Sequence, residues 1–173
     1  MRAIARNRRL FAPEVVQTSS MDCGPAALKC LLEGFGIPVS YGRLREACQT
    51  GVDGTSIDTL EVVSRQLGLD AEQVLVPADH LGLRGRGDAP SLAVLSHPDQ
   101  GTHFVVVWRR VGRWVQVMDP GAGRRWLPLA QLRQQLYRHE TAVDAADWRA
   151  WAESDEHRDA LATRLRRLGV APA

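Results

Sequence analysis

The residues best suited to chemistry lie in one short stretch, Gln17-Thr18-Ser19-Ser20-Met21-Asp22-Cys23-Gly24-Pro25-Ala26-Ala27-Leu28. Asp22 is a residue type that caps helices, and Pro25 falls within a first helical turn, where a missing N–H costs nothing. Cys23 is therefore predicted to open a helix, whose positive end favours a thiolate. Gln17, six residues upstream, carries an amide that can donate a hydrogen bond to an oxyanion. The stretch predicts a cysteine nucleophile.

A base and an acid follow much later in the chain. The segment Gly101-Thr102-His103-Phe104-Val105-Val106-Val107 predicts a strand that opens on a histidine, and Met118-Asp119-Pro120 predicts a strand that closes on an acid. Hydrolysis by cysteine needs a thiolate, a base, a group that orients the base, and a donor to the oxyanion. We assign Cys23 as nucleophile, His103 as base and acid, and Asp119 as the orienting group. The oxyanion donors are Gln17 and the backbone N–H of Cys23.

In this order and spacing, the motifs Gln, Asp-Cys-Gly-x-Ala-x-Leu, His-Phe-Val-Val and Asp-Pro resemble those of the papain-like peptidase domain of bacteriocin-processing ABC exporters. The resemblance spans roughly Glu14 to Val143 and rests on four separate motifs. It implies a papain-like fold and the order Cys, His, Asp for the triad. It also implies an endopeptidase that removes the leader of a ribosomally made precursor after Gly-Gly or Gly-Ala, with no metal or cofactor.

The predicted elements place helices first and antiparallel strands second, which is the α+β order. Helical patterns cover residues 22–33, 40–48, 56–67, 79–81 and 129–137. Strand patterns cover residues 14–16, 71–76, 91–95, 103–109, 114–118, 125–127 and 141–143, and residues 83–88 predict a flexible loop. This order packs N-terminal helices on an antiparallel sheet, so that the helix of the nucleophile meets the strand of the base.

The 173 residues predict one globular domain with two flanking segments. Residues 1–13 form a basic N-terminal arm, residues 14–143 the peptidase domain, and residues 144–173 a helical C-terminal tail. In the resembled family, the region of the tail joins the peptidase to a transmembrane domain. Three interpretations of the tail stay open: a linker, a pair of docking helices that use Trp148 and Trp151, or a dimer contact.

Composition excludes several classes of protein. A net charge of +2, with scattered arginines, gives no indication of a nucleic-acid partner. No apolar run is long enough to span a membrane, and the basic N-terminus lacks the apolar core of a signal peptide. The three cysteines, Cys23, Cys30 and Cys48, are an odd number without metal-ligand spacing, which favours a reducing compartment. We therefore expect a cytoplasmic protein.

Most other candidate residues have simpler interpretations. Cys30 and Cys48 are expected to be inert buried thiols, because this is the usual fate of a cysteine on an apolar helix. The remaining histidines have no metal-ligand spacing and are expected at the surface: His80, His97, His139 and His157. Asp22 is expected to be a helix cap first.

The resemblance also implies partners: the leader peptide of a precursor, and the transmembrane and ATP-binding modules of an ABC exporter, fused or separate. An exporter would hold the domain at the inner face of the cell membrane. Two other functions use the same scaffold. One is a non-catalytic module that binds leader or cargo, and the other is a papain-like acyl transferase, which differs only in the group that attacks the acyl-enzyme.

Overall fold

The computed structural model describes residues 8–81, 90–97 and 101–168. Within them, six α-helices, one short 3₁₀ helix and four strands follow one another along the chain. They are α1 (Cys23–Gly34), α2 (Tyr41–Ala47), α3 (Ile57–Gln66), η1 (Ala78–His80), β1 (Ser91–His97), β2 (Gly101–Val111), β3 (Trp114–Asp119), β4 (Gly123–Pro128), α4 (Leu129–Gln135), α5 (Ala145–Ala152) and α6 (Asp155–Leu168).

The strands form one antiparallel sheet in the order β1-β2-β3-β4, so each strand pairs with its neighbour in the chain. Gly112, with a φ of 59°, makes the tight turn between β2 and β3 in a left-handed conformation that suits glycine. Because β2 and β3 are antiparallel, β2 begins at the end of the sheet where β3 finishes. The topology thereby brings His103, near the start of β2, close to Asp119, the last residue of β3.

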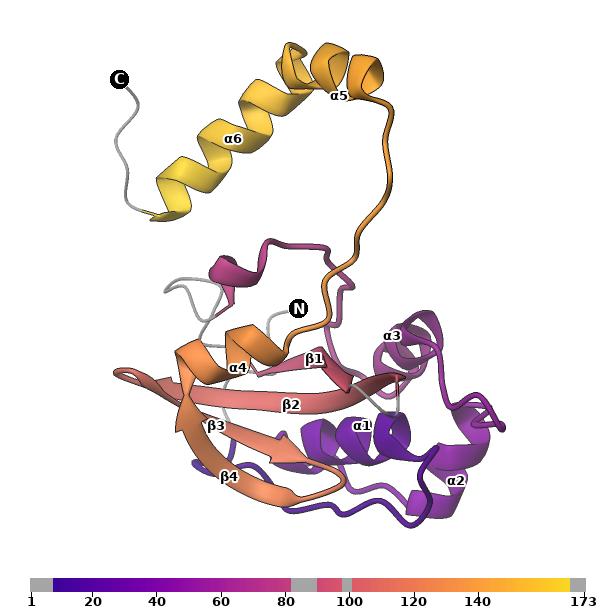
Figure 1. Cartoon of the computed structure of the whole chain (residues 1–173). Helices are drawn as coiled ribbons and strands as arrows, with labels where there is room; N and C mark the ends of the chain where they lie inside the picture. Colours follow the sequence, from indigo (N-terminus) through magenta and orange to yellow (C-terminus); the bar gives the residue numbers. More distant parts are fainter. Residues whose placement is uncertain (1–7, 82–89, 98–100, 169–173) are drawn as a thin grey trace.

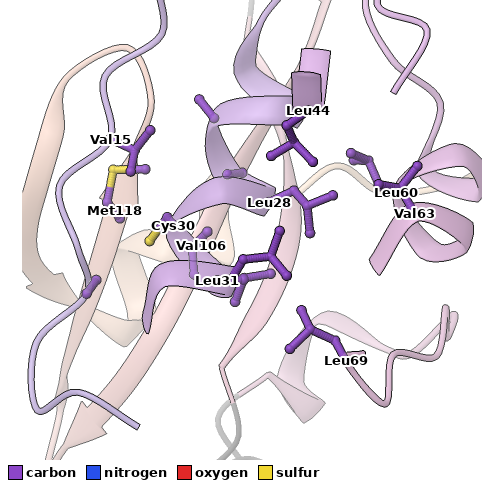
Figure 2. Close-up of a cluster of buried hydrophobic side chains, with 14 of the residues drawn as sticks. Val15, Leu28, Cys30, Leu31, Leu44, Leu60, Val63, Leu69, Val106 and Met118 are labelled. Carbon is purple, nitrogen blue, oxygen red and sulfur yellow. The ribbon is translucent and has the colours of Figure 1, made fainter. Parts of the chain in front are cut away.

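Helices cover both faces of the sheet (Figure 1). On one face, α1 packs against β2, with α2 and α3 beside it. The larger hydrophobic core lies there, and Figure 2 shows Leu28 and Cys30 of α1 gathered with Val106 and Met118 of the sheet. On the other face, α4 closes a second core with Leu132.

Successive residues of β2 divide between the two cores. Val106 and Trp108 belong to the core under α1, whereas Val105 and Val107 belong to the core under α4. This is the two-residue period of a strand, and a strand buried on both faces is apolar at every position. The continuous apolar run after His103 therefore marks a central strand, which holds the histidine at the end of a rigid element.

The C-terminal tail is set apart from these layers. After α4, an extended segment leads away from the sheet to α5 and α6, which pack on each other (Figure 1). Trp148, Trp151 and Leu161 are exposed on these helices. Within the described residues, no helix is both long and apolar enough to cross a membrane.

The predicted helices and four of the seven predicted strands are present. The predicted strands over residues 14–16, 71–76 and 141–143 are wrong, since these segments form no strand. The pattern of Val74, Leu75 and Val76 is typical of a strand, but all three side chains are exposed and the segment has no ladder partner among the described residues. The predicted loop at residues 83–88 lies outside the described residues, as do residues 1–7 of the predicted arm and residues 169–173 of the predicted tail.

Candidate active site

Cys23 is the first residue of α1 and lies half-buried at the helix N-terminus. Burial raises the pKa of its thiol. Hydrogen bonds from His103 and from the backbone N–H groups of Phe104 and Gly24, together with the positive charge of His103, outweigh burial and hold the pKa below the usual value. These are the contacts that stabilise a thiolate, so Cys23 has the environment of a nucleophile.

The imidazole of His103 lies between Cys23 and Asp119. Its Nε2 is 2.8 Å from Asp119 Oδ1, and because an ionised carboxylate only accepts, Nε2–H is the donor. That leaves Nδ1 for the hydrogen bond with the Cys23 thiol. The pKa of His103 is raised to about 9, first by the hydrogen bond to Asp119 and second by the hydrogen bond to Cys23. Near neutral pH the imidazolium is therefore the favoured form of His103, and its charge and hydrogen bond favour the thiolate of Cys23.

Asp119 is buried and has three hydrogen-bond donors. Oδ1 accepts from His103 and from the Gly121 N–H at 2.9 Å, and Oδ2 accepts from Arg125 Nη2 at 2.9 Å. Burial raises the pKa of Asp119, but the bonds from His103 and Gly121 and the charges of His103 and Arg125 outweigh it, so the pKa is lowered. The acid remains ionised and fixes the orientation of the imidazole.

The backbone of Gln17 lies at the same end of the sheet as Asp119. Its N–H donates to the Pro120 carbonyl at 2.9 Å, which ties the loop before α1 to the turn after Asp119. The side-chain Oε1 is buried and has no hydrogen-bond partner among the residues that the structure describes. The structure thus places all four predicted residues at one end of the sheet, with Cys23, His103 and Asp119 in one hydrogen-bonded chain.

Two sets of contacts near Cys23, His103 and Asp119 were missed by sequence reasoning. Arg125 reaches Asp119 because the hairpin pairs Asp119 with Gly123, and Arg125 lies two residues further along β4, on the same face of the sheet. Asp22 occupies the N-cap position of α1, as expected, but its carboxylate makes no capping bond. It bonds instead to Arg45 and Thr18. The hairpin spacing signalled Arg125, whereas nothing local signalled Arg45, because a long-range contact joins it to Asp22.

Within the described part of the chain, the remaining cysteines and histidines take no part in the hydrogen-bonded chain of Cys23, His103 and Asp119. Burial raises the pKa of Cys30 to about 12 and that of Cys48 to about 11, as expected for inert thiols. His139 is exposed, but the expectation of a surface position is wrong for the ring of His80, whose nitrogens are both buried, and for Nδ1 of His157, which is buried too. The side chain of His97 lies outside what the structure describes. Among the described residues, no group of three or more His, Cys, Asp or Glu side chains could hold a metal ion.

A groove of about 1140 Å³ lies along the outer edge of β1. It is lined by residues of the 73–81 segment, by Ser91 to Val94 of β1, by residues from the end of α4 onwards, and by Arg164 of α6. Arg164 Nη2 donates to both carboxylate oxygens of Asp79, at 3.0 and 2.8 Å. Leu95, the residue after the β1 part of the lining, pairs with His103. On β1 the lining therefore stops one residue before the strand pair that contains His103.

The sequence model of the peptidase C39 family matches residues 12–147. The lactococcin-G-processing and transport ATP-binding protein LagD of Lactococcus lactis subsp. lactis is 28% identical over 110 residues, which make up 64% of this chain and 16% of that protein. The chain thus spans a small part of the length of this curated relative.

Two solved structures have a similar fold. One is a double glycine motif protease from an AMS/PCAT transporter in complex with the leader peptide, with a TM-score of 0.63, 21% identity, and coverage of 77% of this chain and 90% of that one. The other is the peptidase domain of Streptococcus ComA, a bi-functional ABC transporter involved in a quorum sensing pathway. Its TM-score is 0.65 at 19% identity, with coverage of 73% and 93%. The predicted α+β fold, with N-terminal helices packed on an antiparallel sheet, is confirmed.

Proposed function

The chain belongs to the peptidase C39 family of cysteine peptidases, and from that premise we propose that it is an endopeptidase acting on the leader of ribosomally made peptide precursors. The cut falls after Gly-Gly or Gly-Ala. The observation that carries this proposal is the hydrogen-bonded chain of Cys23, His103 and Asp119, in which the pKa of the thiol is lowered and that of the imidazole is raised to about 9.

In the acylation step, the Cys23 thiolate attacks the carbonyl carbon of the scissile bond, and the negative charge moves to the carbonyl oxygen. The Gln17 amide and the Cys23 N–H donate hydrogen bonds to that oxyanion. His103 then gives its Nδ1 proton to the leaving amine as the C–N bond breaks, which leaves a thioester and a neutral imidazole. Asp119 holds the ring in orientation throughout.

In the deacylation step, His103 takes a proton from water as the water oxygen attacks the thioester carbonyl. The same two donors stabilise the second oxyanion, and the C–S bond then breaks to release the thiolate and the leader as a carboxylic acid, which loses its proton to solvent. The proton on His103 restores the starting ion pair. Every step uses groups of this chain, substrate and water.

The groove along β1 is suited to an apolar leader. Val74, Leu75 and Val76 expose apolar side chains on its rim, and the groove leads toward the strand position of His103. An amphipathic leader helix would bury its apolar face there and deliver its C-terminal Gly-Gly to Cys23. The similar double glycine motif protease was solved in complex with a leader peptide, which supports this class of ligand.

We further propose that the domain works with the transmembrane and ATP-binding modules of an ABC exporter, fused or separate, at the cytoplasmic face of the membrane. LagD is a processing and transport protein, which supports this pairing. Residues 14–143 would form the peptidase, residues 1–13 an arm, and residues 144–173 a tail that meets the exporter. The exposed Trp148 and Trp151 give the tail an apolar face for that contact.

Cleavage of a synthetic double-glycine leader peptide, followed by mass spectrometry, tests the peptidase. We expect one cut after the second small residue, which Cys23→Ala abolishes and Cys48→Ala leaves in place, because Cys48 is buried elsewhere. A peptide with leucine in place of the last glycine should stay intact. Saturable binding without cutting would instead support a non-catalytic leader-binding module, and transfer of the leader to an added amine in preference to water would support an acyl transferase.

A further inference from the structure

Asp22 is a buried acid that the mechanism above does not use. It directly precedes the nucleophile, and only 1% of its surface is exposed. A carboxylate this deeply buried needs partners, because an unpaired buried charge is costly. Its N-cap position would allow it to bond to the free N–H groups of α1, but its oxygens point to other residues.

The two carboxylate oxygens of Asp22 join separate parts of the chain. Oδ1 accepts a hydrogen bond from Arg45 Nε of α2 at 2.8 Å, and Oδ2 accepts one from Thr18 Oγ1 at 2.9 Å. The Thr18 N–H in turn donates to the Tyr41 hydroxyl at 3.4 Å. The loop before α1 is thus fastened to the start of α1 and, through two contacts, to α2.

The fastened residues are the immediate neighbours of the two oxyanion donors. Thr18 follows Gln17, whose amide is one donor, and Asp22 precedes Cys23, whose N–H is the other. The bond between Thr18 and Asp22 therefore joins the two backbone segments that carry the donors. On its other side, Gln17 is held by its backbone bond to Pro120.

The Gln17 side chain depends on this placement. Its buried Oε1 finds no partner within the described part of the chain, so its side-chain oxygen has no hydrogen bond that orients the amide. The position of the amide then follows from the backbone on either side. Displacement of a donor by about 1 Å is enough to cost roughly 100-fold in rate.

We propose that Asp22 is a positioning residue for the oxyanion hole, because its bonds to Thr18 and Arg45 join the loop before α1 and helix α2 to the residue that precedes the nucleophile. This inference rests on the proposed peptidase function. It assigns to Asp22 the geometry of the two donors, and not the ionisation of Cys23, which depends on His103.

Two reactions of Cys23 separate these roles. Alkylation by iodoacetamide needs the thiolate but forms no oxyanion. Peptide hydrolysis, and reversible binding of the aldehyde N-acetyl-glycyl-glycinal as a tetrahedral thiohemiacetal, need the oxyanion donors as well. Loss of the oxyanion hole alone should therefore slow hydrolysis and weaken aldehyde binding while alkylation continues at the wild-type rate.

The test compares Asp22→Asn, Thr18→Val and Arg45→Gln with wild type, and uses Arg43→Gln as the matched control on the exposed side of α2. We expect kcat to fall by about 10- to 100-fold in Asp22→Asn and less in the other two, in line with the loss of an oxyanion-hole contact. KM and the alkylation rate should stay unchanged, and the aldehyde affinity should fall in parallel with kcat. Arg43→Gln should match wild type.

An unchanged kcat in both Asp22→Asn and Thr18→Val would overturn the inference, as would an alkylation rate that falls as far as kcat. Thr18→Val keeps the side-chain volume, so it remains informative if Asp22→Asn folds poorly. If the wild-type chain cuts no leader peptide, the proposed function fails, whereas the ratio of aldehyde affinity to alkylation rate still decides the role of Asp22.

Discussion

Helix α1 carries two thiols in contrasting environments, one at its first residue and one two turns later. Cys23 opens the helix and has a lowered pKa, whereas the pKa of Cys30, two turns later, is raised to about 12. Helical position alone does not explain this contrast. The first turn of α1 meets the polar start of β2, where His103 and backbone N–H groups stabilise a thiolate. The later turns lie in the hydrophobic core, where burial disfavours a thiolate.

Figure 2 shows the surroundings of Cys30, with Leu28, Leu31 and Val106 nearby. Further along, Gly34 ends the helix against the ring of Trp108, which is fully buried. The comparison teaches that one helix can serve chemistry at its start and packing at its end. Substitutions at the two ends should therefore have separable effects, on activity at one end and on stability at the other.

The largest expected effect comes from replacing His103, which contacts Cys23 in the first turn of α1. His103→Ala removes the base, the acid and the group that stabilises the thiolate, so kcat/KM on a leader peptide should fall by at least about 1000-fold. The melting temperature should change little, since the His103 side chain is partly exposed and outside both hydrophobic cores. A variant that loses folding along with activity would remove the separation between the two ends.

A second prediction compares the thiols directly. Iodoacetamide at neutral pH should modify Cys23 at least about 100-fold faster than Cys30 or Cys48, because reactivity follows the thiolate fraction and exposure. Mass spectrometry of tryptic peptides after timed labelling measures all three rates in one sample. In His103→Ala the rate at Cys23 should drop toward those of the other two. Equal labelling of Cys23 and Cys30 in the native protein would contradict the comparison.

The opposite end is tested by Gly34→Ala. A Cβ at this position would overlap the indole of Trp108. We expect a loss of about 1–3 kcal/mol in the free energy of unfolding, measured by urea denaturation, because overpacking a filled core forces side chains and backbone to shift. Gly42→Ala is the matched control, since its Cβ would meet open space. A folded Gly34→Ala protein with wild-type stability but reduced kcat would reverse the assignment of this end to packing.

The sequence was sufficient for the elements that carry the site. The polar loop before an apolar helix located Cys23, and the continuous apolar run located β2 and its opening histidine. Antiparallel order then followed from short turns, which made His103 and Asp119 neighbours. Local patterns were enough here because each of these residues lies at the end of a regular element.

Contacts between distant segments were beyond the sequence. The salt bridge of Asp22 to Arg45 depends on how α2 packs beside α1, and the strand predicted over residues 71–76 failed because a strand needs a partner that composition cannot supply. Residues 14–16 failed for the same reason. What the sequence could not predict is tertiary pairing.

The smallest expected effect concerns the second cation on Asp119. Arg125 shares the carboxylate with His103, so Arg125→Gln leaves the full negative charge to the imidazolium, and the pKa of His103 should rise above about 9. Because activity requires the imidazolium, the alkaline limb of kcat/KM should move to higher pH. The shift should be less than about one unit, since Arg125 is half exposed and solvent screens its charge.

Asp119→Asn removes the first cause of the raised pKa of His103, so its alkaline limb should move the other way, to lower pH. Arg124→Gln, on the same strand but bonded to the Ala12 carbonyl, should leave the limb in place. Profiles of kcat/KM between about pH 5 and pH 10 measure all three variants. A limb that moves to lower pH in Arg125→Gln would mean that Arg125 supports the ion pair instead of competing for Asp119. The ion pair of Cys23 and His103 would then depend on Arg125 as well as on Asp119.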